Sequence, residues 1–283
     1  METRFVKTNG IQLQVRIAGP ENGKPVFLLH GFPDFWFCWE AQIEALVASG
    51  FRVVAPDQRG YGHSDKPLGK EAYRQKILAA DIVGLMGALG YDKINLAGHD
   101  FGGAVAWSVA TLYPERVEKL VIISAPHLIA SMKYSKINKT QKYKSWYIAF
   151  FQLPKLPERF LKAFNYRVLI KNMPASLSPE TIERYRSGWS QPNAIHTMVN
   201  WYRGLLDGMK AREIEYGRID IPTHIMWGKN DKYLEAGLAK LSLEQCSKGR
   251  LTVFEDTSHW VMHERSNEVS ALLLKHFSTS EIE

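Results

Sequence analysis

Short, continuous apolar runs recur along this chain, and stretches with helical spacing separate them. The apolar runs occupy positions 25–29, 51–56, 94–97, 120–124, 223–228 and 251–254. Helical spacing of apolar residues is found at 40–48, 82–89 and 269–277. Apolar runs of this kind are typical of strands buried on both faces of a parallel sheet, and their alternation with helices predicts a doubly wound α/β core.

The first residues of the chain predict a β-hairpin. Two runs, 5–8 and 13–17, flank the dipeptide Asn9-Gly10. This dipeptide favours the two-residue turns that join antiparallel strands, because both residues tolerate a positive φ. We therefore expect two strands joined at this turn, ahead of the strand–helix alternation.

The alternation stops between about His127 and Tyr216. This segment is rich in aromatic residues and lysines, has helical periodicity and lacks a convincing buried strand. We interpret it as a helical cap inserted into the core. The predicted boundaries are 1–126 and 219–283 for the two parts of the core and 127–218 for the cap. Ligands of such sheets bind beyond the carboxyl ends of the strands.

The composition fits a soluble globular protein that can bury a large core. The chain has 283 residues, of which 45% are hydrophobic and 23% are charged. Its two cysteines, Cys38 and Cys246, form neither a disulfide framework nor a metal-ligand spacing. No run has the length of a signal peptide core or of a transmembrane helix. These features predict a cytoplasmic protein without a membrane span or a bound metal.

The net charge of +7 requires that anionic partners be considered. Part of the excess lies in one segment, at Lys133, Lys136, Lys139, Lys142 and Lys144. We interpret this segment as a solvated face. No nucleic-acid partner is expected, because no binding fold or glycine-rich phosphate loop accompanies the lysines.

An acid stands at the point of the chain where a nucleophile is expected. Asp100 lies in Gly98-His99-Asp100-Phe101-Gly102-Gly103, between an apolar run and a helix-like run. A strand, a glycine-framed residue and a helix together form a nucleophile elbow. A carboxylate there suits displacement at an sp³ carbon, which leaves an alkyl ester on the enzyme. The alternative is that Asp100 simply caps the helix.

Two further polar residues follow buried strands. Asp231 comes after the run 223–228, and His259 comes after the run 251–254. The order Asp100, Asp231, His259 is that of nucleophile, acid and base in α/β-hydrolase triads. A lone acid or histidine in a loop is usually a surface group, but three at strand ends in this order indicate a catalytic triad.

The turn after the strand 25–29 supplies a fourth element. Its sequence is His30-Gly31-Phe32-Pro33. Proline lacks a backbone donor and allows a cis bond, so Pro33 can shape this loop until the Phe32 amide faces the elbow. Together with the Phe101 amide it would form an oxyanion hole. The alternative is an ordinary turn.

These residues resemble the signature blocks of the α/β-hydrolase epoxide hydrolases. The blocks are HGFP at 30–33, DQRGYGHS at 57–64 and GHDFGG at 98–103, and the resemblance extends over essentially the whole chain. It implies an α/β-hydrolase fold and two cap tyrosines, Tyr147 and Tyr202, whose hydroxyls contact the epoxide oxygen. Phe101 departs from the family, which commonly has Trp at this position.

The resemblance implies hydrolysis of an epoxide by water to a vicinal diol, without a cofactor. Aromatic residues near the motifs suit an apolar aryl or alkyl epoxide. The predicted pocket residues are Trp36, Phe150, Trp201 and Trp260. Two alternatives remain open: a haloalkane or haloacid dehalogenase with the same triad, and a non-catalytic ligand-binding relative. The sequence defines no oligomeric state.

Overall fold

Eight strands form one sheet in the computed structural model, which describes residues 1–279. Their order across the sheet is β1-β2-β4-β3-β5-β6-β7-β8. The strands are β1 (Glu2–Thr8), β2 (Ile11–Ala18), β3 (Pro25–Leu29), β4 (Arg52–Pro56), β5 (Ile94–His99), β6 (Val117–Ile123), β7 (Thr223–Gly228) and β8 (Gly249–Phe254). The six apolar runs of the sequence correspond to β3 to β8.

The sheet is parallel except at one edge. Strands β3 to β8 pair in parallel, whereas β2 pairs antiparallel with both β1 and β4. The hairpin expected at Asn9-Gly10 is confirmed: Thr8 faces Ile11, and the two turn residues have φ values of 43° and 78°. The structure is thus the α/β architecture that the alternation predicts.

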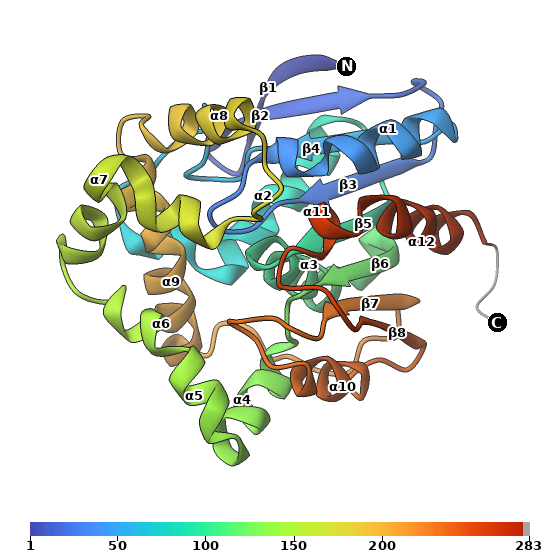
Figure 1. Ribbon diagram of the computed structural model, residues 1–283. Coiled ribbons are helices and arrows are strands. Elements are labelled where there is room, and N and C mark those ends of the chain that lie inside the picture. The colour runs from blue at the N-terminus through green and yellow to red at the C-terminus, as the bar shows by residue number, and fades with distance from the viewer. Residues whose placement is uncertain (280–283) are drawn as a thin grey trace.

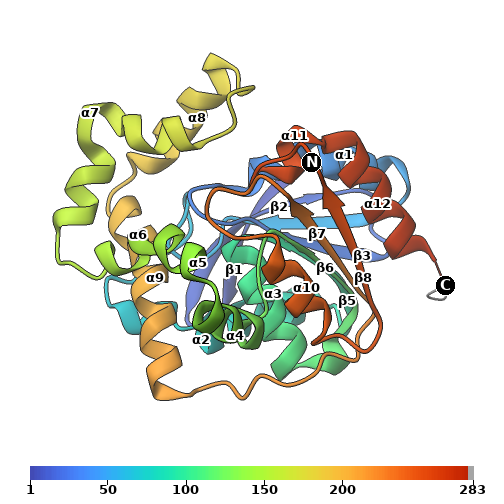
Figure 2. The same cartoon turned by 60° about the horizontal axis from the view of Figure 1, so that its bottom comes forward.

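Helices cover both faces of the sheet, as Figures 1 and 2 show. The core helices are α1 (Glu40–Ala48), α2 (Gln75–Ala88), α3 (Phe101–Leu112), α10 (Gly237–Leu243), α11 (Val261–Glu264) and α12 (Ser266–Ser278). Three short 3-10 helices, η1 (Trp36–Trp39), η2 (Lys70–Tyr73) and η3 (Pro114–Arg116), lie in connecting loops.

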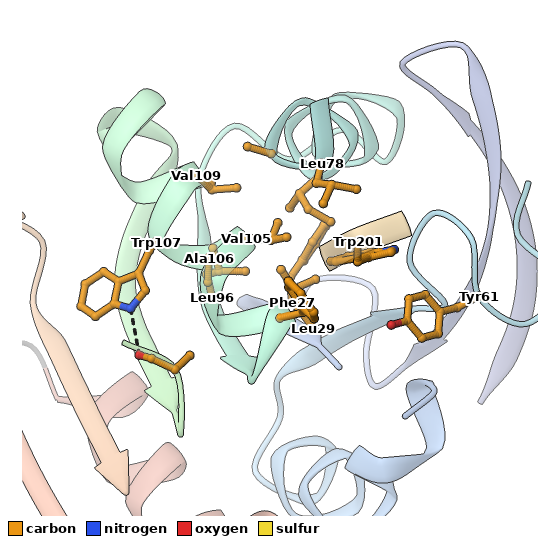
Figure 3. Packing of buried hydrophobic residues seen from close by; sticks show 14 of the residues in the cluster. Phe27, Leu29, Tyr61, Leu78, Leu96, Val105, Ala106, Trp107, Val109 and Trp201 are labelled. Atoms are coloured by element: carbon orange, nitrogen blue, oxygen red, sulfur yellow. Dashed lines mark hydrogen bonds between the residues drawn. The ribbon is translucent and has the colours of Figure 1, made fainter. Parts of the chain in front are cut away.

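Alternate residues of β3 pack into two separate hydrophobic clusters. Val26 and Leu28 belong to the cluster formed with α1 and α12, and Phe27 and Leu29 belong to the cluster formed with α2 and α3. Figure 3 shows part of the second cluster, where the Trp107 indole also donates a hydrogen bond to a backbone carbonyl. Burial on both faces explains why this strand is continuously apolar.

Six helices are inserted between β6 and β7. They are α4 (Leu128–Ile137), α5 (Lys139–Lys144), α6 (Trp146–Phe150), α7 (Leu156–Asn172), α8 (Pro179–Trp189) and α9 (Ala194–Ala211). Within the described chain no strand interrupts them, and α6 to α9 lie on the side of the molecule opposite the C-terminal helix (Figures 1 and 2). Helix α7 is broken at 163–166, where three consecutive residues have positive φ.

The strand register brings four loops to one edge of the sheet. Leu29 of β3 pairs with Gly98 of β5, and Gly228 of β7 pairs with Phe254 of β8. The loops that follow these strands carry the residues singled out in the sequence. Among the helices of residues 1–279, none combines the length and the apolarity needed to cross a membrane.

Candidate active site

Asp100 occupies a sharp turn between β5 and α3. Its φ of 51° and ψ of −121° are rare for a residue with a side chain. Asp100 stands at the N-cap position, but its carboxylate makes no capping hydrogen bond. Instead, Oδ1 accepts a hydrogen bond of 2.9 Å from the Phe32 amide. The side chain is therefore directed toward the neighbouring loop rather than toward its own helix.

The turn depends on glycines because backbone packs directly on backbone. A Cβ atom on Gly102 would collide with the carbonyl oxygens of Leu29 and His30, and one on Gly98 would collide with the Gly102 carbonyl. No shift of a flexible side chain can relieve these clashes. The glycine framing seen in the sequence is thus a steric requirement of the turn.

We expect Gly102→Ala to lower the free energy of unfolding by about 2 kcal/mol or more, because the added methyl group must displace backbone. Gly87→Ala is the matched control, since a Cβ at this exposed position of α2 meets nothing. Alanine is the better helix former, so the control should be about 0.5–1 kcal/mol more stable than the wild type. Urea unfolding followed by circular dichroism measures both. Equal stabilities for the two variants would contradict this account of the turn.

The structure brings Asp100, Asp231 and His259 together from three loops. His259 Nδ1 donates a hydrogen bond of 2.7 Å to Asp231 Oδ2, and His259 Nε2 lies 3.4 Å from Asp100 Oδ2. The other oxygen of Asp231 accepts from the amides of Tyr233 and Leu234, at 2.8 and 2.9 Å. Asp231 is buried and fully hydrogen-bonded, so it fixes the orientation of the imidazole.

Opposite charges control the protonation of this group. Burial disfavours the charged form of His259, but the carboxylates of Asp231 and Asp100 outweigh it and raise its pKa to about 10. Burial also acts against the charged form of Asp100. His259, His99 and the Phe32 amide nevertheless hold the pKa of Asp100 below its ordinary value. At neutral pH the pair is an ionised carboxylate beside an imidazolium.

Stability should depend on this imidazolium. The pKa of His259 is about 10 in the folded state, against 6.5 for an ordinary histidine. Its proton therefore contributes stability that is complete below about pH 6.5 and is lost as the pH rises toward 10. We expect the wild type to lose unfolding free energy relative to His259→Gln over this range, as measured by urea unfolding at several pH values. Parallel curves for the two proteins would contradict the charge assignment.

The loop after β3 holds the Phe32 amide in place. The Phe32-Pro33 bond is cis, and the Pro33 carbonyl accepts a hydrogen bond from the Trp189 indole. The buried His30 side chain donates through Nδ1 to the Gly31 carbonyl and accepts through Nε2 from the Gln58 amide. Burial lowers the pKa of His30 to about 4, so this side chain is neutral. Position 31 requires glycine, because a Cβ atom there would collide with the side chain of Asp100.

A cavity of about 450 Å³ opens in front of these groups. Its lining includes Asp100 and His259 from loops of the core and Tyr147 and Tyr202 from helices α6 and α9 of the insertion. Neither tyrosine hydroxyl has a hydrogen-bond partner among residues 1–279. Burial raises the pKa of both hydroxyls. The rest of the lining is mainly apolar and includes Phe150, Phe151, Phe160, Leu161, Val168, Leu169 and Trp260.

Two of the four predicted pocket residues lie elsewhere. Phe150 and Trp260 line the cavity, but Trp36 and Trp201 do not. Trp36 packs under the Arg16 guanidinium, 4.7 Å from its ring centre. Trp201 precedes Tyr202 on α9 and therefore points in another direction, against Phe101 and Tyr61 in the core. Phe101 in turn packs edge-on against Tyr202, with 4.6 Å between ring centres.

Three contributors to the site escaped the sequence analysis. Tyr233 lines the cavity and packs edge-on against His259, with 5.3 Å between ring centres. Lys144 donates to the Asp231 carbonyl at 2.8 Å, and His99 Nε2 donates to the His259 carbonyl at 3.0 Å. The positions of Tyr233, two residues after Asp231, and of His99, directly before Asp100, were the available signals. Nothing in the sequence pairs Lys144 with a core loop.

Comparison with known proteins agrees with this geometry. The family description of the α/β hydrolase fold matches residues 24–266. The chain is 42% identical to the AB hydrolase superfamily protein YfhM of Bacillus subtilis strain 168, over 98% of both chains. It is 34% identical to epoxide hydrolase 4 of Mus musculus, over 95% of this chain and 77% of that protein. The crystal structure of Bacillus megaterium epoxide hydrolase with an inhibitor superposes with a TM-score of 0.90 at 28% identity, covering 98% of this chain and 100% of that one.

The chain belongs to the α/β-hydrolase fold family, within its epoxide hydrolase group. The resemblance drawn from the motifs is confirmed, and so are the mostly parallel sheet and the α/β-hydrolase fold.

Proposed function

We propose that this protein hydrolyses apolar aryl or alkyl epoxides to vicinal diols through a covalent ester on Asp100. One observation carries the proposal. Two tyrosines, whose hydroxyls have no partner in the described part of the chain, share a mainly apolar cavity with a carboxylate and a histidine. A ring oxygen needs hydrogen-bond donors as its bond to carbon breaks, and a ring carbon needs a nucleophile on the opposite side.

In the first step, the Asp100 carboxylate attacks a ring carbon and the carbon–oxygen bond of the epoxide breaks. The products are an alkyl ester of Asp100 and an oxygen that takes up negative charge. Tyr147 and Tyr202 donate hydrogen bonds to this oxygen, and one of them transfers its proton. Burial raises the pKa of both tyrosines, so their hydroxyls keep their protons at neutral pH until this step.

Formation of the ester changes the charge balance around His259. Asp100 is one of the two carboxylates that raise the histidine pKa, and it becomes neutral as an ester. The pKa of His259 then falls, and the proton that it releases restores the hydroxyl of the tyrosine that gave up its proton. The neutral imidazole, oriented by Asp231, can now act as a base.

In the second step, His259 takes a proton from water as the water oxygen attacks the carbonyl carbon of the ester. The tetrahedral intermediate carries a negative oxygen, which the amides of Phe32 and Phe101 stabilise. The Phe32 amide already donates to Asp100, and Phe101 is the first residue of α3, whose amide the helix leaves without an internal partner. The intermediate then collapses: the ester oxygen leaves with the proton from His259 as the diol, and the Asp100 carboxyl returns its proton to His259, which restores the carboxylate and the imidazolium. In this scheme the inserted segment 127–218 serves as the cap that supplies both tyrosines.

The available donors favour an epoxide over an alkyl halide as the substrate. A departing halide needs N–H donors rather than a proton. The indole of Trp201 donates to the Arg59 carbonyl at 2.9 Å, and that of Trp260 donates to the Asn172 carbonyl at 2.8 Å. Phe101, next to the nucleophile, has no polar group in its side chain. Tyr147 and Tyr202 supply two unoccupied hydroxyl donors in the cavity, whereas the Trp146 indole, which also lacks a partner within residues 1–279, belongs to a side chain that is 62% exposed.

The proposal is tested by offering styrene oxide and phenyl glycidyl ether beside 1-bromobutane and fluoroacetate. We expect diol from the epoxides and no halide from the other two compounds. Release of halide without diol would assign the protein to the dehalogenases. Absence of any product from all four, with binding of the epoxides in calorimetry, would instead favour a ligand-binding protein.

A further inference from the structure

Positive charge is concentrated in one part of the insertion. Residues 127–172, from α4 to α7, contain ten lysines and arginines and a single carboxylate, Glu158, a formal charge of +9. The whole chain carries +7, so the remaining residues are slightly acidic. Glu158 offers little compensation at the surface, because it is paired with Arg203 at 2.7 Å and with His196 at 3.0 Å. Nine of the ten cationic side chains in this segment are exposed.

The same segment exposes large apolar side chains. We use the name aromatic rim for four exposed aromatic residues and two leucines of this segment: Tyr143, Trp146, Leu153, Leu156, Phe160 and Phe164. Their exposed fractions run from 43% for Phe160 to 86% for Phe164. Exposed apolar residues scattered singly need no explanation, but a cluster of them marks an interaction surface.

Three residues of the aromatic rim belong to the lining of the cavity. Trp146 lies 5.9 Å from Phe150 between ring centres, and Phe150 lies 5.5 Å from Phe160. Tyr143, Trp146, Phe150 and Phe160 also line the cavity that contains Asp100. A path therefore leads from exposed apolar side chains of this positively charged segment to the half-buried carboxylate of Asp100.

We propose that the face formed by α4 to α7 docks on the surface of an anionic phospholipid bilayer. Trp, Tyr, Phe and Leu side chains beside lysines are the combination that binds at a lipid–water interface, the apolar groups entering the acyl boundary and the cations meeting the headgroups. This is peripheral attachment, and it requires no membrane-spanning helix. The aliphatic residues of the rim favour a bilayer over nucleic acid, for which Leu153 and Leu156 offer no stacking surface.

Docking in this orientation turns the cavity mouth toward the membrane. An apolar epoxide dissolved in the acyl chains could then reach Asp100 without crossing water. This consequence rests on the proposed function, whereas the docking itself does not. The tests below measure binding without turnover, so a failure of one proposal leaves the other standing.

The first test is co-sedimentation with vesicles of phosphatidylcholine alone or with 30% phosphatidylglycerol, at 0.1 M salt. We expect binding to the anionic vesicles only. Each cation near an anionic surface strengthens binding about fivefold. The triple variant Lys133→Glu/Lys139→Glu/Lys162→Glu should therefore bind at least about 100-fold more weakly than the wild type. The triple variant Lys7→Glu/Lys93→Glu/Lys248→Glu is the matched control. It makes the same change in net charge at exposed lysines of the core.

None of the six lysines makes a side-chain hydrogen bond or ion pair within residues 1–279, and thermal unfolding verifies that both variants fold. The control should keep most of the binding to anionic vesicles. Equal losses in the two variants would show a non-specific effect of net charge and would overturn the proposal. Tighter binding to a single-stranded RNA oligonucleotide than to the vesicles at the same salt would also overturn it, in favour of a nucleic-acid surface.

The second test uses the tryptophans as reporters of depth. Trp146 is 62% exposed, whereas the other seven tryptophans of the chain are each at most 7% exposed. Vesicles with brominated acyl chains should quench part of the fluorescence of the wild type and leave that of Trp146→Phe unchanged. Absence of quenching in the wild type while it is bound would show that the rim does not enter the membrane, and the proposed orientation would be wrong.

Discussion

With His259 replaced by glutamine, the protein is expected to react once with an epoxide and then stop. Removal of His259 raises the pKa of Asp100, but the Phe32 amide still donates to its carboxylate and the glutamine amide can donate in place of the imidazolium, so we expect Asp100 to remain an ionised nucleophile. The base that deprotonates water is missing, since glutamine cannot accept a proton at neutral pH. Steady-state turnover should fall by about 1,000-fold, within the range that a general base supplies. The ester should therefore accumulate to one equivalent.

Mass spectrometry of the intact protein detects this ester as a gain of one substrate mass, and peptide mapping locates it. The adduct should lie on the peptide that contains Asp100. The double variant Asp100→Asn/His259→Gln is the control and should gain no mass. An unmodified His259→Gln protein that has lost turnover would contradict the two-step scheme, because His259 would then be needed before any ester forms.

The second large effect is expected from removal of both cap hydroxyls. In Tyr147→Phe/Tyr202→Phe, the ring oxygen must leave without a hydrogen-bond donor or a proton. We expect kcat/KM for styrene oxide to fall by about 1,000-fold. Each single variant should lose about 10- to 100-fold, because the other hydroxyl remains. The defect should lie in ester formation, as measured by the burst of bound substrate in a rapid-quench experiment.

Tyr233→Phe is the matched control for the tyrosine pair. Tyr233 lines the same cavity, and burial raises its pKa to about 12. Its hydroxyl, however, donates a hydrogen bond of 2.8 Å to the Asn172 side chain rather than pointing to an open position. This variant should keep turnover within about fivefold of the wild type. A loss as large as that of the double variant would remove the special role of Tyr147 and Tyr202.

Much of the fold could be predicted because its signals are local. A strand such as β3 is continuously apolar because both of its faces are buried, and the turn at Asn9-Gly10 has the positive φ values that this dipeptide favours. The positions of Asp100, Asp231 and His259 could be located for a similar reason. Each lies in the segment that follows a parallel strand, and these strands end at one edge of the sheet.

The walls of the cavity could not be predicted because they depend on how the insertion packs on the core. Adjacent residues of a helix point in different directions, so Trp201 enters the core while Tyr202 faces the cavity. The break in α7 at 163–166 has no marker such as proline or glycine. Lys144 reaches the Asp231 carbonyl across a sequence separation of 87 residues. Such contacts are set by tertiary packing and leave no periodic trace.

The most direct test of the covalent step is a single turnover in water labelled with ¹⁸O, with enzyme in excess over styrene oxide. Water attacks the carbonyl carbon of the ester in the proposed mechanism, so the label should enter the carboxylate of Asp100 and the first diol should contain only ¹⁶O. Digestion of the enzyme should then show a gain of one ¹⁸O on the Asp100 peptide. A labelled diol released from an unlabelled enzyme would mean that water attacks the epoxide directly, and the ester on Asp100 would be excluded.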